Sequence, residues 1–292
     1  MKRFILIFAV AVAIVSCDKI EKPYRISGDI GDVDTPAFSE LKNVIQKYLF
    51  EDYTGHLCNN CPEGAEVIKN LKAAMGDTLV AMAVHAGVES MVKPNPVEKG
   101  CSNGYTADYR TAAGSEYAAT FGVNNNPSAM INRKVFDGSR VLINVANWAA
   151  AMNSIPRKQP SMGIQIIPVH RSDTAYIFIK TTLLSDVSGK LRLCAVLVEN
   201  GIVSPQKNSK SSIGGVNICD YEHNHMLRAS VTSTWGDVLE LSKKDDAQIK
   251  AYALLLAGKS WKKENCRIIV YIYDDDTKEI LQVEEAELLK DE

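Results

Sequence analysis

A pair of cysteines stands at the junction between a strand-like and a helix-like segment, and this junction constrains the fold most strongly. Residues 44–54 end in an apolar run that is typical of a buried strand. After Cys58 and Cys61, apolar side chains recur at helical spacing over residues 62–75. The backbone N–H groups and the dipole at a helix start favour a thiolate on the first cysteine, and the short spacing allows the pair to close a disulfide. The pattern predicts a strand, a cysteine pair and a helix in direct succession.

A proline later in the chain supports this interpretation. Gly122 and Val123 precede Asn126-Pro127, and an apolar segment over residues 129–131 follows. The chain thereby resembles thioredoxin-like domains, which carry a cis proline at the start of a strand that faces the cysteine pair. Only the peptide bond before a proline adopts the cis form at low cost. The alternative is a trans Asn126-Pro127 turn that opens a strand.

Two departures from the thioredoxin pattern flank the pair. Leu57 replaces the tryptophan that precedes the first cysteine in thioredoxins, and Pro62 follows the second cysteine. A proline in the first helical turn is tolerated, because its missing N–H has no intrahelical partner there. The Asn-Asn spacer provides no rule for the reduction potential, so the sequence does not choose between an oxidant, a reductant and an isomerase.

The first residues have the features of a targeting segment. Lys2 and Arg3 precede an apolar run over residues 4–15, which is too short to span a bilayer comfortably. Residues 1–16 are therefore predicted to be a signal peptide. The small residue before Cys17 resembles a bacterial lipobox, which implies a lipid on Cys17. An ordinary signal peptide or an uncleaved anchor is the alternative. Residues 17–37 are predicted to be a lipidated tether, or else a segment packed on the first domain.

Charge and cysteine content narrow the classes of partner and compartment. The formal net charge of −2 implies no bulk attraction to nucleic acid, so no nucleic-acid partner is predicted. Of seven cysteines, six remain besides Cys17, and an even number outside the cytoplasm permits disulfides. Connectivity cannot be deduced from sequence. Cys194 lies in an apolar run, which favours a buried free thiol at least as much as a disulfide.

Removal of the signal peptide leaves enough residues for two domains. Residues 38–156 are predicted to form an α/β thioredoxin-like domain, with helices over 39–47 and 141–155 and a strand over 78–85 that pairs parallel to the strand before the cysteines. The residues from 161 to 292 contain a series of short strands with polar turns, which predicts an all-β, sandwich-like domain.

Two long loops are also predicted. Residues 86–113 carry several prolines and glycines and are interpreted as an insertion that lies over or beside the cysteine end of the sheet. Residues 202–218 are rich in Ser, Lys and Gly, and they are predicted to be an exposed loop of the second domain.

Four segments together resemble the outer membrane protein 28 related family of bacterial lipoproteins. They are Thr54–Pro62, Val196–Asn200, Tyr221–Arg228 and Tyr271–Val283. The resemblance implies a thioredoxin-like N-terminal domain, a β-rich C-terminal domain and a place at the outer membrane. The biochemical role of that family is not well defined, and adhesion or receptor roles have been proposed for its members. The resemblance therefore specifies architecture better than activity.

Two functions from different classes follow. The first is an envelope thiol–disulfide oxidoreductase in which Cys58 attacks, Cys61 resolves and Pro127 aligns a bound peptide. The second is a non-enzymatic surface-binding or adhesin-type lipoprotein in which the same pair is a structural disulfide. The intact cysteine pair and Pro127 favour the first. The 86–113 insertion and the large second domain favour the second, because they would occlude the cysteines.

Histidines offer few further sites. His56 is expected to be an exposed loop imidazole, which either lowers the Cys58 pKa when protonated or has no role. A zinc ion at Cys58 and Cys61 would need two more ligands, and His223 and His225 are the only other cluster in the sequence. A core or hydrogen-bonding role at the domain interface is favoured for these two residues. No metal and no cofactor are therefore predicted. The predicted partners are the membrane, through the lipid, and a protein or peptide.

Overall fold

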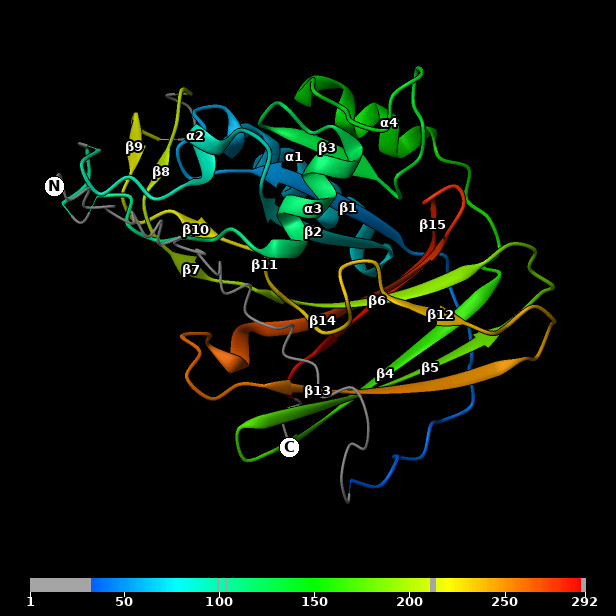
Figure 1. The fold of residues 1–292 in the computed structure, drawn as a ribbon. Coiled ribbons are helices and arrows are strands. Elements are labelled where there is room, and N and C mark those ends of the chain that lie inside the picture. The colour runs from blue at the N-terminus through cyan, green and yellow to red at the C-terminus, as the bar shows by residue number, and fades with distance from the viewer. Residues whose placement is uncertain (1–32, 99, 103, 211–213, 290–292) are drawn as a thin grey trace, which may run out of the picture.

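The computed structural model describes residues 33–289 except 99, 103 and 211–213 (Figure 1). The predicted signal peptide, Cys17 and residues 18–32 of the predicted tether lie outside the described residues. No helix in the described ranges combines the length and apolar character that a bilayer crossing needs.

In the described part of the chain, the largest sheet has eight strands. Seven follow the order β15–β14–β6–β11–β2–β1–β3, and β12 pairs with β6. The strands are β1 (Tyr48–Thr54), β2 (Leu79–His85), β3 (Ser128–Ile131), β6 (Leu191–Glu199), β11 (Met226–Ser230), β12 (Asp237–Leu239), β14 (Cys266–Asp274) and β15 (Ile280–Glu287). The sheet therefore combines strands from both predicted domains.

The first two strands pair as predicted. β1 and β2 pair in parallel, with Tyr48 opposite Leu79, and β3 pairs antiparallel to β1. The sheet continues into the second half of the chain through β2 and β11, where the Ala83 N–H donates to the His225 carbonyl over 2.8 Å. The predicted boundary near residues 156–161 falls just before β4, and the division into domains stays a prediction.

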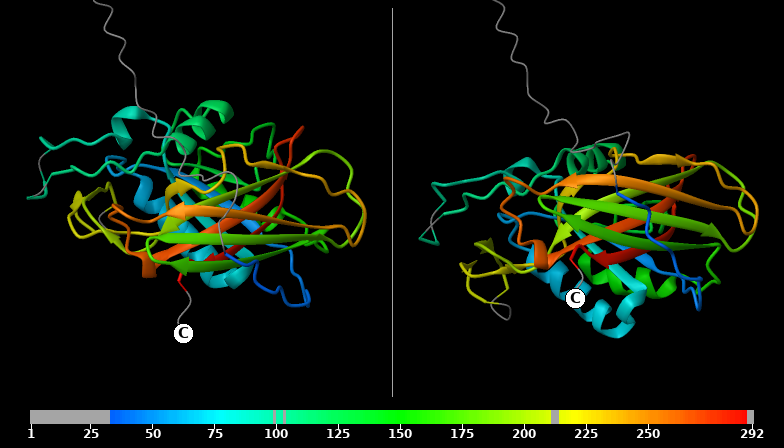
Figure 2. Two further views of the ribbon diagram at one scale, coloured as in Figure 1. Left: turned by 60° about the horizontal axis from the view of Figure 1, so that its bottom comes forward. Right: turned by 90° about the horizontal axis from the view of Figure 1, so that it is seen from below.

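A second sheet packs over one face of the first. It consists of the antiparallel strands β4 (Met162–Arg171), β5 (Thr174–Leu183) and β13 (Ala247–Leu255), and it lies in front in the view from below (Figure 2). In β6, Leu193 and Leu197 belong to the core between the sheets, whereas Cys194 and Val196 belong to the core on the opposite side. Burial of both faces explains the nearly continuous apolar sequence of β6. The fold is mostly β with few helices, as expected for a sandwich.

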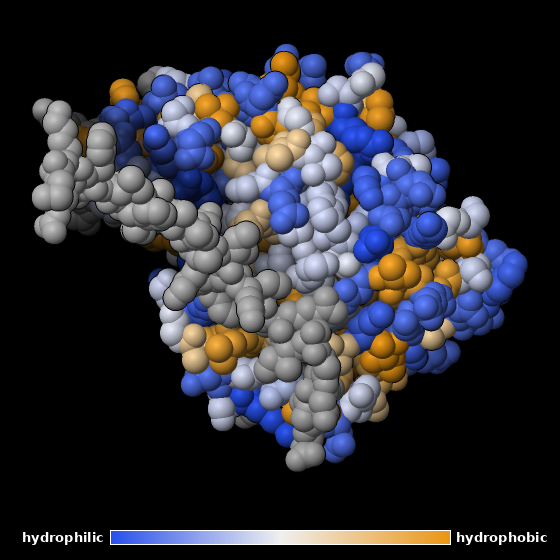
Figure 3. All heavy atoms as spheres, in the orientation of Figure 1, coloured by the Kyte–Doolittle hydropathy of each residue, from blue (hydrophilic) through white to orange (hydrophobic). Residues whose placement is uncertain are grey.

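Helices cover the first three strands. α1 (Cys61–Met75) and α4 (Trp148–Ser154) pack on one face of β1 and β3, and α3 (Ala112–Phe121) packs on the other face (Figure 1). The shorter elements are α2 (Glu89–Val92), the 3-10 turns η1 (Gly76–Thr78), η2 (Val145–Asn147) and η3 (Lys263–Asn265), and two ribbons of β7 (Ile202–Val203) with β10 (Glu222–His223) and β8 (Gln206–Lys207) with β9 (Asn217–Ile218). On the face seen in Figure 3, hydrophobic side chains are scattered among hydrophilic ones.

The helix predicted over residues 39–47 is wrong. This segment is irregular, Asn43 has a φ of 51°, and the Gln46 side chain donates to the Leu281 carbonyl over 2.8 Å. Leu41 packs against Gly163 of β4 so closely that a Cβ there would lie 2.7 Å from it. Leu41 and Val44 are therefore partly buried by tertiary contacts and not on a helix face, whereas Ile45 is 46% exposed.

Candidate functional site

The two cysteines form a disulfide at the start of α1, which the sequence spacing permits. Cys58 and Cys61 are bonded, with their Cα atoms 5.4 Å apart, and Cys61 is the first residue of the helix. Asn60 occupies the N-cap position without a side-chain hydrogen bond to the helix. The Cys58 N–H donates to the Gly55 carbonyl over 3.0 Å, which turns the chain between β1 and α1. The positive end of the helix dipole therefore faces the pair.

Pro127 lies beside the first turn of the same helix. The Asn126–Pro127 peptide bond is cis, and Pro127 is buried. A Cβ added at Gly64 would lie 3.6 Å from the Pro127 Cβ, which places the proline against the beginning of α1. The structure therefore brings Pro127 to the helix that begins with Cys61.

The side chain of Asn126 fixes the loops around the disulfide. Its Nδ2 donates to the carbonyl oxygens of Thr54, over 3.1 Å, and Ala86, over 2.8 Å. Its Oδ1 accepts from the Val88 N–H over 2.7 Å. These three bonds join the ends of β1 and β2 to the start of β3.

Both cysteines are buried, and a segment from the second half of the chain lies against their loop. Cys58 is 1% exposed and Cys61 is 2% exposed. The residues 206–210, called the cap segment below, lie against the cysteine loop. The Lys207 N–H donates to the His56 carbonyl over 2.8 Å, and the Ser209 N–H donates to the Asn59 carbonyl over 2.8 Å. The predicted occlusion of the cysteines is thus present in this structure.

Side chains add to these backbone contacts. Gln206 is 2% exposed, and its Nε2 donates to the Cys58 carbonyl over 3.0 Å and to the Gly55 carbonyl over 3.2 Å. Lys210 forms an ion pair with Glu63 of α1 over 2.5 Å. The prediction that residues 202–218 form an exposed loop is therefore wrong for Gln206, because buried carbonyl groups of the cysteine loop accept hydrogen bonds from its polar side chain.

A second disulfide joins two loops beside the first. Cys101, in the predicted 86–113 insertion, is bonded to Cys219, which follows β9. Cys194 and Cys266 are buried free thiols. For Cys194 this outcome agrees with the apolar character of its strand.

His56 is part of a buried aromatic cluster, which corrects its expected exposure. It is 1% exposed, and its Nε2 lies 3.1 Å from the Lys93 carbonyl oxygen. The His85 ring centroid lies 6.0 Å from that of His56 and 5.8 Å from that of His223, and the Tyr109 centroid lies 5.1 Å from that of His85. His223 is 6% exposed and is therefore a core residue, which is one of the roles that the sequence favours for it.

The three imidazoles are uncharged at neutral pH. Burial lowers the pKa of His56, lowers that of His85 well below its ordinary value, and lowers that of His223 to about 4. A neutral His56 cannot provide the positive charge that would stabilise a Cys58 thiolate. Across the described ranges, no group of three or more His, Cys, Asp or Glu side chains is arranged to hold a metal ion.

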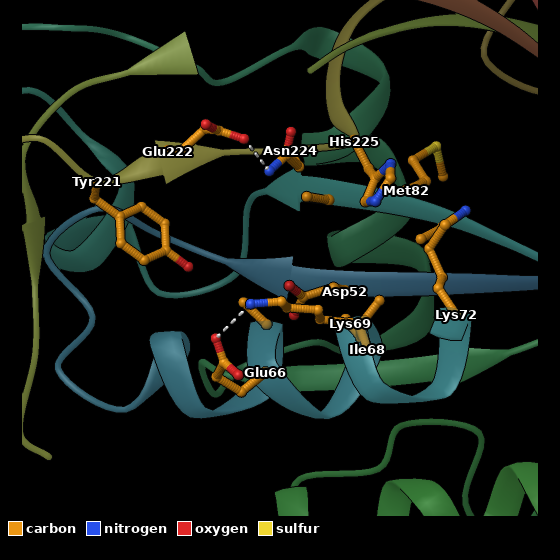
Figure 4. Close-up of a pocket in the computed structure, with 13 residues that line it drawn as sticks. Asp52, Glu66, Ile68, Lys69, Lys72, Met82, Tyr221, Glu222, Asn224 and His225 are labelled. Carbon is orange, nitrogen blue, oxygen red and sulfur yellow. Dashed lines mark hydrogen bonds and ion pairs between the residues drawn. The ribbon is translucent and has the colours of Figure 1, made fainter. Parts of the chain in front are cut away.

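Asp52, on the strand that leads into the cysteine loop, is a second candidate residue that the sequence-based reasoning missed. It lies on β1, is 5% exposed, and its Oδ1 has no hydrogen-bond partner among the described residues. Burial raises the pKa of Asp52 to about 7. It lines a cavity of about 580 Å³ between α1 and residues 221–225, together with Lys69 and His225 (Figure 4). The available signal was a carboxylate within an apolar strand that leads into the cysteines.

Glu51, the neighbour of Asp52, is buried on the opposite face of β1 and is fully paired. Arg133 donates to it through Nε and Nη2, each over 2.9 Å, and both side chains are 0% exposed. The Arg133 guanidinium also lies 4.9 Å from the Tyr117 ring centroid and 5.2 Å from that of Tyr271. The ion pair thus joins β1 to the turn after β3, and Arg133 Nη2 also donates to the Tyr271 hydroxyl of β14 over 3.3 Å.

A family model described as outer membrane protein Omp28 matches residues 114–292, more than half of the chain. The chain belongs to the Omp28 family. It is accordingly a protein of the outer membrane in the cell envelope, as the sequence resemblance implies. The match begins after Cys58 and Cys61, so it covers neither cysteine of the candidate site.

Solved structures provide a comparison of folds. HBP35 of Porphyromonas gingivalis is similar with a TM-score of 0.61 and 14% identity, over 84% of this chain and 76% of that one. At this identity the likeness concerns the fold alone. A domain of the outer membrane lipoprotein Omp28 from Porphyromonas gingivalis aligns with a TM-score of 0.31 and 19% identity, over 44% of this chain and 88% of that one. The comparison with curated proteins found no match.

Proposed function

We propose that this Omp28 protein is anchored to the outer membrane by lipid on Cys17, and that its thioredoxin-like N-terminal half exchanges thiols and disulfides with an envelope protein through Cys58 and Cys61. The observation that carries this proposal is the unpaired, buried carboxyl of Asp52. The parallel pair of β1 and β2 and the position of Pro127 beside α1 support the thioredoxin-like assignment.

A purely structural disulfide does not require a buried Asp52 carboxyl whose Oδ1 has no hydrogen-bond partner among the described residues. A buried polar atom without a partner costs roughly 1–3 kcal/mol, so its presence indicates another benefit. A pKa of about 7 allows the Asp52 carboxyl both to accept and to release a proton near neutral pH. Asp52 also lies on the strand that leads to Cys58, and it lines the cavity beside the helix that begins with Cys61.

The exchange begins with the reduced pair. The Cys58 thiolate, stabilised by the start of α1, attacks one sulfur of a substrate disulfide, and the other substrate sulfur leaves as a thiolate. Cys61 then loses its proton towards the Asp52 carboxylate and attacks the Cys58 sulfur. The second substrate sulfur leaves, and the Cys58–Cys61 disulfide of the described structure results. The substrate gains two electrons and two protons, and the pair loses them.

The second candidate function is a non-enzymatic binding protein with a structural disulfide. The burial of Cys58 and Cys61 beneath the cap segment favours it, because a partner thiol cannot reach either sulfur in this conformation. In this alternative, the thioredoxin-like half serves as a scaffold and Asp52 has no chemical role.

A thiol titration distinguishes the two. The full chain in detergent is equilibrated in thiol–disulfide buffers of increasing reducing strength, alkylated, and read at Cys58 and Cys61 by mass spectrometry, with circular dichroism as the check on folding. Thiol–disulfide exchange predicts a reversible transition of this pair in folded protein. If the pair stays oxidised until the protein unfolds, the disulfide is structural and the exchange proposal is rejected.

A further inference from the structure

The cap segment is attached to the second disulfide through a short β-ribbon. β8 forms the start of the cap, and it pairs with β9 so that Gln206 lies opposite Ile218 and Lys207 opposite Asn217. Cys219 directly follows β9. Cys219 is therefore joined directly, through β9, to the strand pair that carries the cap.

The other end of this cross-link is held against the cysteine site. Cys101 lies between Asn95 and Tyr105, whose backbones pair with each other over 2.7 and 3.3 Å. The Tyr105 ring packs on His56 with a centroid distance of 5.7 Å, and its hydroxyl donates to the Asn217 side chain over 2.8 Å. The Cys101–Cys219 bond thus ties β9 to a loop that contacts the residues preceding Cys58.

The two disulfides differ in their access to solvent. Cys219 is exposed and Cys101 is half-buried, whereas Cys58 and Cys61 are almost fully buried. A disulfide is broken by a thiolate that reaches one of its sulfurs. An external thiol can therefore attack Cys219 in the described conformation, but not Cys58.

Without the Cys101–Cys219 cross-link, non-covalent contacts alone would hold the cap. Two of these are weak because they are exposed to water: the bond of Ser209 to Asn60, and the ion pair of Lys210 with Glu63, whose side chains are 47% and 34% exposed. Local opening of such a segment needs less free energy than global unfolding.

We propose that Cys101–Cys219 is a second redox site, attacked by an external dithiol, and that its reduction releases the cap segment and opens Cys58–Cys61 to partner proteins. This inference rests on the proposed exchange at Cys58–Cys61. One thiolate of the dithiol attacks the Cys219 sulfur, and Cys101 leaves as a thiolate. The second thiol of the reductant attacks the mixed disulfide and releases Cys219. The dithiol becomes a disulfide, and two electrons and two protons pass to the two cysteines.

The test compares the full-length wild-type protein with the Cys101→Ser/Cys219→Ser variant in detergent. Dithiothreitol is added, samples are alkylated at intervals, and each cysteine is quantified by mass spectrometry. In wild-type protein, Cys101 and Cys219 become modified before Cys58 and Cys61. In the variant, Cys58 and Cys61 become modified about tenfold faster than in wild type, because opening no longer awaits the first reduction.

Three results would overturn the inference in different ways. Equal rates in the two proteins, or modification of Cys58 before Cys219 in the wild type, would show that Cys101–Cys219 does not control access to Cys58–Cys61. Neither result would contradict the proposed exchange at Cys58–Cys61. A Cys58–Cys61 bond that resists reduction in both folded proteins would reject both proposals together.

A second measurement is independent of the folding of the variant. Wild-type protein is treated with just enough dithiothreitol to reduce Cys101–Cys219, and amide hydrogen exchange is followed. The amides of Lys207 and Ser209 exchange about tenfold faster after this reduction, whereas those of β1 do not change. Unchanged protection of Lys207 and Ser209 would contradict the release of the cap.

Discussion

Glu51 and Asp52 are neighbours on β1, and their buried carboxyl groups lie on opposite faces of this strand in different surroundings. Glu51 accepts two hydrogen bonds from the buried Arg133 guanidinium. Asp52 lines a cavity beside α1, and within the described chain its Oδ1 has no hydrogen-bond partner. One carboxylate is paired within the core, whereas no hydrogen bond to Oδ1 offsets the burial of the other, and the second is the one for which we propose chemistry.

The Glu51 face joins the two halves of the fold. Five aromatic rings lie within 5.9 Å of the Arg133 guanidinium, those of Tyr117, Phe121, Trp235, Tyr271 and Tyr273. These rings come from both sides of the predicted domain boundary. A guanidinium in such surroundings retains its charge only with a partner, which is Glu51.

The largest effect is expected from Arg133→Met. This change leaves Glu51 charged and unpaired in the core, and it should lower the free energy of unfolding by about 3–5 kcal/mol. Urea denaturation measures the loss. The matched control is Glu51→Leu/Arg133→Met, which removes both charges and should recover most of the stability. A loss below about 1 kcal/mol in the single variant would mean that the Glu51 carboxylate does not need this partner in the core.

Asp52→Asn should instead raise the free energy of unfolding. The folded-state pKa of Asp52 is about 7 and its ordinary value is 3.8, so the folded protein retains this proton where the unfolded chain has lost it. Wild-type stability attributable to Asp52 therefore falls as pH rises from about 4 to about 7. The variant should gain up to about 4 kcal/mol over wild type at pH 8 and nothing near pH 4. Denaturation at several pH values measures the gap, and a gap independent of pH would contradict the assignment.

His223→Phe tests the buried imidazoles. The folded-state pKa of His223 is about 4 and its ordinary value is 6.5, so the unfolded chain binds this proton more readily. Its contribution to stability is present above about pH 6.5 and is lost as pH falls towards 4. As pH falls over this range, the free energy of unfolding of the variant should decrease by roughly 3 kcal/mol less than that of wild type. Parallel acid-induced slopes in the two proteins would show that His223 is not buried in its neutral form.

The smallest effect is expected from Gln206→Ala in the cap segment. The change removes two hydrogen bonds to buried carbonyls of the cysteine loop, and it should cost about 1–2 kcal/mol. Reduction of Cys58–Cys61 should become a few times faster. Ser209→Ala is the matched control, because its side-chain bond is exposed and its removal should have little effect. Equal rates in the two variants would show that Gln206 does not hold the cap closed.

Local patterns predicted the strand and the helix around Cys58 and permitted the disulfide, because apolar periodicity and a two-residue spacing are properties of the chain alone. The burial of His56 could not be predicted in this way, because its neighbours His85 and Tyr109 come from distant parts of the sequence. The cap was missed for a similar reason. Gln206 is polar, and only the tertiary structure supplies the buried carbonyls that it bonds.

The proposed transfer of the Cys61 proton to Asp52 should be visible in the pH dependence of thiol–disulfide exchange. Fully reduced wild-type protein and Asp52→Asn are mixed with a peptide that contains a disulfide, and formation of Cys58–Cys61 is followed by acid quenching and mass spectrometry. The wild-type rate should rise with pH with a midpoint near the Asp52 pKa of about 7, and the variant should be about tenfold slower at pH 7.5 without that rise. Identical pH profiles in the two proteins would contradict the account.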